Sequence, residues 1–173
     1  SQAIADVDSA KLQMSLSSAM SRSVQTRLER LAHSLDSITE LFLIGSGPYY
    51  PIALEGAIKI AEVSYINAVG FATGELKHGP LALIQEGVVC LILGDTSRDL
   101  RAASVLRARG AYVIGIAPND NQEFDVHIPT QEQEPYALAV SLVALQLLAY
   151  YLSVSRGIDP DRPRNLAKSV TVQ

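Results

Sequence analysis

An amine and a carboxylate lie three residues apart in the segment Glu-Gly-Ala-Ile-Lys-Ile-Ala-Glu, residues 55–62. If this segment is helical, Lys59 and Glu62 share one face of the helix. An exposed ion pair of this kind contributes little to stability. A functional pair, with a carboxylate that handles protons, is the alternative. The spacing alone favours the exposed ion pair.

A second group of ionisable side chains stands in Thr-Gly-Glu-Leu-Lys-His-Gly-Pro, residues 73–80. Because His78 is followed by Gly79 and Pro80, it sits on restrained backbone, which suits an acid–base role. A structural histidine that caps the next helix fits equally well, and both interpretations stay open. His33 and His127 share no spacing with it, so the histidines predict no metal site.

The segment Gly-Ser-Gly, residues 45–47, follows an apolar run and precedes a helix that we expect to open at Pro51. Free backbone amides at the carboxyl end of a parallel strand can hold an anion. The same segment also suits a tight strand–helix connection. The motif alone does not decide between the two.

Short apolar runs alternate with helical patterns and would position these residues. Several runs are apolar on both faces, as strands covered by helices on both sides require. We therefore predict a three-layer αβα fold with a five-stranded, mainly parallel sheet, preceded by one long N-terminal helix over about residues 8–40. The predicted strands are 41–45, 68–72, 88–94, 112–118 and 126–129, and the predicted organisation is a leading helical segment (1–40), a sheet domain (41–156) and an irregular tail (157–173).

Composition narrows the class of protein. The 173 residues are 48% hydrophobic and 18% charged, with a net charge of −4, which indicates a globular chain and gives no sign of nucleic-acid or membrane binding. Cys90 is the only cysteine, so no internal disulfide is possible and a cytoplasmic location is expected. Its apolar surroundings predict inert packing.

The motifs Gly-Glu-Leu-Lys-His-Gly-Pro-Leu-Ala-Leu-Ile (74–84) and Arg-Pro-Arg-Asn-Leu-Ala-Lys-Ser-Val-Thr-Val-Gln (162–173) resemble the glutamine–fructose-6-phosphate aminotransferases. Ala-Leu-Glu-Gly-Ala-Ile-Lys-Ile-Ala-Glu-Val-Ser-Tyr (53–65) is similar to that family as well. The resemblance covers roughly residues 41–173, which correspond to the second of two sugar isomerase (SIS) domains and the C-terminal tail. The residues before them would join the two domains.

The resemblance implies a role for each matching residue. Lys168 would form an imine with open-chain fructose 6-phosphate, and Glu62 would carry a proton between C1 and C2. His78 would assist ring opening in the neighbouring subunit of a homodimer. Lys59, Arg164 and the backbone of Ala167 would bind the sugar or the closing tail. The resemblance implies no metal and no cofactor.

A tail that folds over the site would suit this chemistry. A lysine of ordinary pKa, about 10.4, is mostly protonated at neutral pH and is a poor nucleophile. Desolvation under the tail would lower that pKa and would keep water from the imine.

The resemblance also implies partner domains that this sequence does not contain, namely a glutaminase domain and a first SIS domain with much of the phosphate site. We therefore expect a fragment of that enzyme, carrying most of its isomerase chemistry. Two alternatives remain. One is another SIS phosphosugar isomerase or deglycase, and the other is a non-catalytic SIS module that binds a phosphosugar.

Overall fold

The computed structural model describes residues 7–130 and 135–166. Five parallel strands form one sheet in the order β2-β1-β3-β4-β5. The strands are β1 (Glu40–Gly45), β2 (Asn67–Ala72), β3 (Val89–Leu93), β4 (Tyr112–Ala117) and β5 (Val126–Pro129). The α-helices are α1 (Ser9–Ala19), α2 (Arg22–Ser34), α3 (Tyr49–Ser64), α4 (Ser97–Arg107) and α5 (Tyr136–Ser155), and two 3₁₀ helices are η1 (Thr73–His78) and η2 (Pro80–Leu83).

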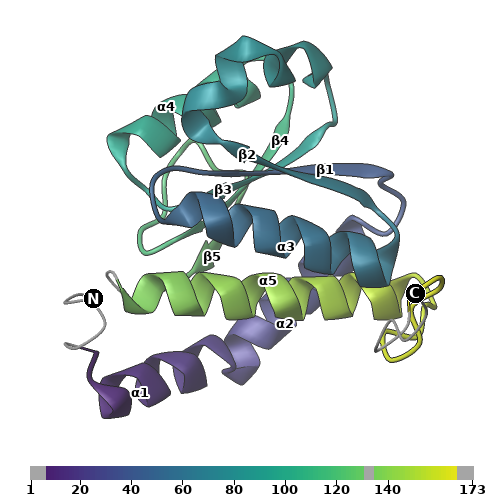
Figure 1. Cartoon of the computed structure of the whole chain (residues 1–173). Coiled ribbons are helices and arrows are strands. Elements are labelled where there is room, and N and C mark those ends of the chain that lie inside the picture. Colours follow the sequence, from purple (N-terminus) through teal and green to yellow (C-terminus); the bar gives the residue numbers. More distant parts are fainter. Residues whose placement is uncertain (1–6, 131–134, 167–173) are drawn as a thin grey trace, which may run out of the picture.

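The sheet lies between two helical layers, as predicted (Figure 1). Strand β3 explains why, because all five of its residues are buried. Successive side chains of a strand point to opposite faces. Leu91 and Leu93 join a core with α2, α3 and α5, whereas Cys90 and Ile92 join a core with α4 and η1. Apolar residues on both faces therefore specify a strand that is covered on both sides.

The prediction of one long leading helix is wrong, because the structure has two. The chain turns at Met20 and Ser21, and Ser21 has the extended backbone of an N-cap residue (φ −62°, ψ 151°). The break lets α1 pack on α5 while α2 packs on both α5 and β5. Four serines in α1 also weaken its helix propensity.

Helix α5 is the longest element and contains no charged residue. By length and composition it could cross a membrane, but half of its apolar window is buried inside the fold. It packs along α3 and α2, and its fully buried leucines, such as Leu145 and Leu148, join the same core as α3 (Figure 1). Its hydrophobicity thus serves the core of the domain.

Candidate active site

The connection between β1 and α3 positions the candidate catalytic helix. A Cβ atom on Gly45 would lie 2.6 Å from the carbonyl oxygen of Tyr49, so only glycine lets the helix begin this close to the strand. Gly47 has a φ of +53°, and the amide of Tyr49 donates to the carbonyl of Ser46. These contacts favour the tight strand–helix connection over an anion site. The helix begins at Tyr49, two residues before the predicted start.

Lys59 and Glu62 form a close pair on the last turns of α3. The Lys59 Nζ lies 2.9 Å from an oxygen of Glu62 and 3.7 Å from an oxygen of Glu55. The side chains of Lys59 and Glu62 are 37% and 36% exposed, so the pair is open to a ligand. An exposed ion pair contributes little to stability. Glu55 is a member of the cluster that the sequence analysis did not single out.

The ion pair fixes the protonation state of the amine. The pKa of Lys59 is raised above its usual value, chiefly because the ammonium donates a hydrogen bond to Glu62. Partial burial lowers this pKa, and the negative charges of Glu62 and Glu55 raise it further. Lys59 is therefore a cation at neutral pH. This charge state suits an amine that orients a carboxylate or another oxygen better than one that acts as a nucleophile.

The tail returns to the same end of α3. The backbone N–H of Arg164 donates to the hydroxyl of Tyr65 at 2.9 Å, and the guanidinium lies over the Tyr65 ring, 4.0 Å from its centroid. Tyr65 follows the last residue of α3 and has a φ of +60°, an uncommon conformation for a bulky residue. Arg164 is thereby brought close to the end of the helix that carries Glu62. Sequence reasoning missed Tyr65, since nothing in the local sequence marks its contact.

The predicted residues Ala167 and Lys168 lie outside the described residues. Arg164 is the last predicted site residue that the structure places. Only three residues separate Arg164 from Lys168 in the sequence.

His78 does not meet Glu62 within one chain. Glu62 lies near the end of α3, whose apolar face packs with α5 on one face of the sheet. His78 ends η1, whose Leu76 belongs to the core on the other face. The two residues also lie near opposite ends of strand β2. Helix α3, which carries Glu62, leads into the start of β2, and η1, which carries His78, follows its end. His78 is exposed to solvent.

The remaining candidates have structural environments. His127 places a ring nitrogen 2.8 Å from the carbonyl oxygen of Ala117, and His33 is exposed on α2. Cys90 is packed in the core, as its apolar surroundings predicted, and burial raises the pKa of its thiol to about 12. Within residues 7–130 and 135–166, no three metal-binding side chains gather into a possible metal site.

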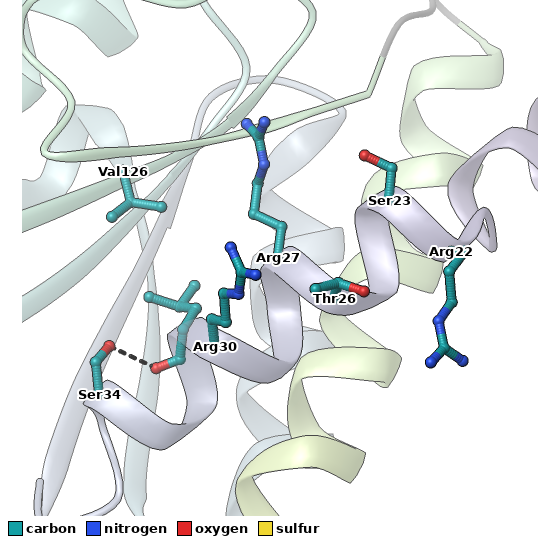
Figure 2. Close-up of a pocket in the computed structure, with 8 residues that line it drawn as sticks. Arg22, Ser23, Thr26, Arg27, Arg30, Ser34 and Val126 are labelled. Atoms are coloured by element: carbon teal, nitrogen blue, oxygen red, sulfur yellow. Dashed lines mark hydrogen bonds between the residues drawn. The ribbon is translucent and has the colours of Figure 1, made fainter.

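An open groove of about 520 Å³ lies along α2 and is also lined by Val126 of β5 (Figure 2). Arg27 and Arg30 extend to the same side of α2 there, whereas Arg22 points in another direction (Figure 2). Arg27 donates to the carbonyl oxygen of His127 at 2.8 Å. This arginine therefore ties α2 to the edge strand β5, which is a structural role.

The sheet order 2-1-3-4-5 with helices on both faces defines a doubly wound α/β domain, a class in which ligands bind near the ends of the strands. The family model described as "SIS domain" matches residues 34–156. The chain therefore belongs to the SIS domain family.

Curated relatives give a closer comparison. The chain is 42% identical to a glutamine–fructose-6-phosphate aminotransferase (isomerizing) of Methanothermobacter thermautotrophicus, over 84% of this chain and 26% of that protein. It is 44% identical to the protein of the same name from Thermococcus kodakarensis, over 84% of this chain and 25% of that protein. The chain thus spans about a quarter of the length of these relatives.

Solved structures agree with this comparison. The C-terminal domain of a glucosamine-fructose-6-phosphate aminotransferase from Francisella tularensis superposes with a TM-score of 0.77 and 28% identity, over 88% of this chain and 45% of that one. A glucosamine-6-phosphate deaminase from Thermotoga maritima superposes with a TM-score of 0.68 over 86% of this chain and 46% of that one. At 24% identity, the second likeness concerns the fold alone.

Proposed function

We propose that this chain is the sugar isomerase part of an amidotransferase that converts fructose 6-phosphate and ammonia from glutamine into glucosamine 6-phosphate. The observation that carries the proposal is the cluster at the end of α3, where the Lys59–Glu62 pair lies three residues from Tyr65, the residue that holds Arg164. The names of the relatives supply the reaction. A glutaminase domain and a first SIS domain belong to the proposed full-length protein.

Two lysines have different roles in this proposal. The hydrogen bond to Glu62 raises the pKa of Lys59 and so favours its cationic form, which makes it a poorer nucleophile than a desolvated lysine. Lys168, carried by the tail that Tyr65 holds, forms the imine at C2 of the open-chain sugar with loss of water, and ammonia later replaces the lysine nitrogen at C2, which releases Lys168. Lys59 instead orients Glu62 and binds a sugar oxygen, while Arg164 and the Ala167 backbone support the closing tail.

Glu62 is the proton carrier. Conversion of the ketose to the aldose requires one proton to leave C1 and one to reach C2, and a single carboxylate beside both carbons performs both transfers. Its hydrogen bond from Lys59 holds it in one orientation. A half-exposed position at a helix end leaves space for the substrate.

His78 requires a second copy of the chain. Because Glu62 and His78 lie on opposite faces of the sheet, His78 can assist ring opening only in the site of a neighbouring subunit. A homodimer is therefore part of the proposal. The proposal also includes that the protein is a soluble enzyme of the cytoplasm.

The test follows solvent deuterium into the sugar. The chain is incubated with fructose 6-phosphate in D₂O, with the upstream SIS domain added in a parallel sample, and the sugar is analysed by NMR. We expect deuterium at C1, the carbon from which Glu62 removes a proton. The exchange rate should be at least about 100-fold lower for Glu62→Gln. Glu29→Gln, on α2, is the control for loss of an exposed carboxylate. Exchange at the wild-type rate in Glu62→Gln would contradict the proposed role.

A further inference from the structure

A second cleft, of about 440 Å³, lies between η1 and α4. This volume lies in the range of small-molecule sites. Leu76, Ala102 and Val105 give it an apolar lining, and Leu76 is only 3% exposed. Three cations also line it, namely Lys77, Arg98 and Arg101.

The cations come from two elements that the fold brings together. Arg98, Arg101, Ala102 and Val105 stand at positions i, i+3, i+4 and i+7 of α4, so they share one face of that helix. Lys77 comes from η1, which packs against α4. The sequence separates Lys77 from Arg98 by twenty further residues, so the cluster exists only in the folded chain.

No carboxylate among the described residues neutralises this cluster. The lining includes no Asp or Glu, and none of the three cations has an acidic partner within 4 Å in the described part of the chain. Asp99, the acidic residue of α4, is fully buried and accepts hydrogen bonds from the hydroxyls of Thr73 and Thr96. Glu75 of η1 is exposed and is not part of the lining.

The arrangement disfavours a purely structural role for the arginines. Arg98 stands in the first turn of α4, where the helix dipole disfavours a positive charge. The chain as a whole is acidic, with a net charge of −4, so three unpaired cations around one cleft are not its general surface character. A bound anion would neutralise the three cations and would offset the unfavourable interaction of Arg98 with the helix dipole.

We propose that this cleft binds a small organic phosphate, with the anionic group on Lys77, Arg98 and Arg101 and the organic part on Leu76, Ala102 and Val105. The cleft lies beside η1, which follows the carboxyl end of β2, in the region where open α/β sheets bind ligands. This inference uses none of the residues at the end of α3 and shares with the proposed isomerisation only η1, which carries both Lys77 and His78.

Calorimetric titration of the whole chain with phenyl phosphate tests the proposal, with inorganic phosphate and phenol as comparison probes. Both parts of the cleft contribute, so we expect phenyl phosphate to bind more tightly than either probe. The double variant Arg98→Gln/Arg101→Gln should weaken phenyl phosphate binding by about tenfold or more, since charge-assisted hydrogen bonds are lost. The charge-matched control Arg22→Gln/Arg30→Gln, two exposed arginines of α2 outside the cleft, should bind as the wild type does.

Three results would overturn the proposal. They are no binding of phenyl phosphate to the wild type at millimolar concentration, equal affinity for inorganic phosphate and phenyl phosphate, and equal weakening in the control. Circular dichroism establishes that both double variants are folded. Chemical-shift changes on labelled protein give a second readout, and they should appear in η1 and α4. Changes confined to other elements would contradict the assignment.

Discussion

The contact between Tyr65 and Arg164 gives the sharpest prediction, because it is the link between the tail and α3. The hydroxyl of Tyr65 accepts the Arg164 N–H, and the ring carries the guanidinium. The hydrogen bond contributes about 0.5–1.5 kcal/mol and an exposed cation–π contact about 0.5–1 kcal/mol. Tyr65→Leu removes both, about 1–2.5 kcal/mol together, so the open population of the tail should rise roughly 5- to 70-fold. Tyr65→Phe retains the ring and loses only the hydrogen bond, so the open population should rise about 2- to 12-fold, less than in Tyr65→Leu.

Limited trypsin digestion measures this opening, since Arg164 must leave Tyr65 before the protease can bind it. The rate of cleavage after Arg164 should increase in the order wild type, Tyr65→Phe, Tyr65→Leu. Tyr150→Phe, which alters an exposed tyrosine on α5, should cleave as the wild type does. If Tyr65→Leu is cleaved at the wild-type rate while its thermal unfolding is unchanged, Tyr65 does not hold the tail.

Three further predictions concern the fold that supports the site. Cys90 should resist a thiol reagent at pH 8 until the chain is unfolded in urea. Because burial raises the pKa of this thiol to about 12 in the folded chain, the thiol ionises first in the unfolded chain, at about pH 8.5. The free energy of unfolding should therefore fall as the pH rises above about 8.5. Gly45→Ala should destabilise the chain by about 1–3 kcal/mol in urea denaturation, because the new Cβ meets the Tyr49 carbonyl at 2.6 Å. Asp99→Ala should cost about 1–3 kcal/mol by the same measurement, since it leaves the buried hydroxyl of Thr73 without its acceptor and removes part of the α4 cap.

The sequence predicted the strands well because their signal is local. The five predicted runs match the five observed strands to within one residue at each end. Apolar residues on both faces also predicted the helical layers correctly. The leading helix was predicted wrongly because the break at Ser21 depends on tertiary contacts. Apolar periodicity continues through this position, so the pattern alone cannot reveal the turn.

The candidate site was predictable only where its residues are close in the sequence. Lys59 and Glu62 are three residues apart on a helix, and the structure pairs them as the spacing predicts. The Tyr65–Arg164 contact joins residues 99 positions apart, so no local pattern encodes it. The cationic cleft between η1 and α4 also joins residues that are distant in the sequence, so no local pattern predicts it. The roles of Lys168, Glu62 and His78 remain predictions.

Imine trapping tests the central claim most directly. The chain is incubated with fructose 6-phosphate and borohydride, alone and with the upstream SIS domain, and is then digested with trypsin and analysed by mass spectrometry. The proposal predicts a reduced sugar adduct on Lys168, which blocks cleavage there and leaves a single heavier peptide, residues 165–173. Unmodified Lys168 with normal cleavage in both samples, or an adduct on Lys59 instead, would contradict it.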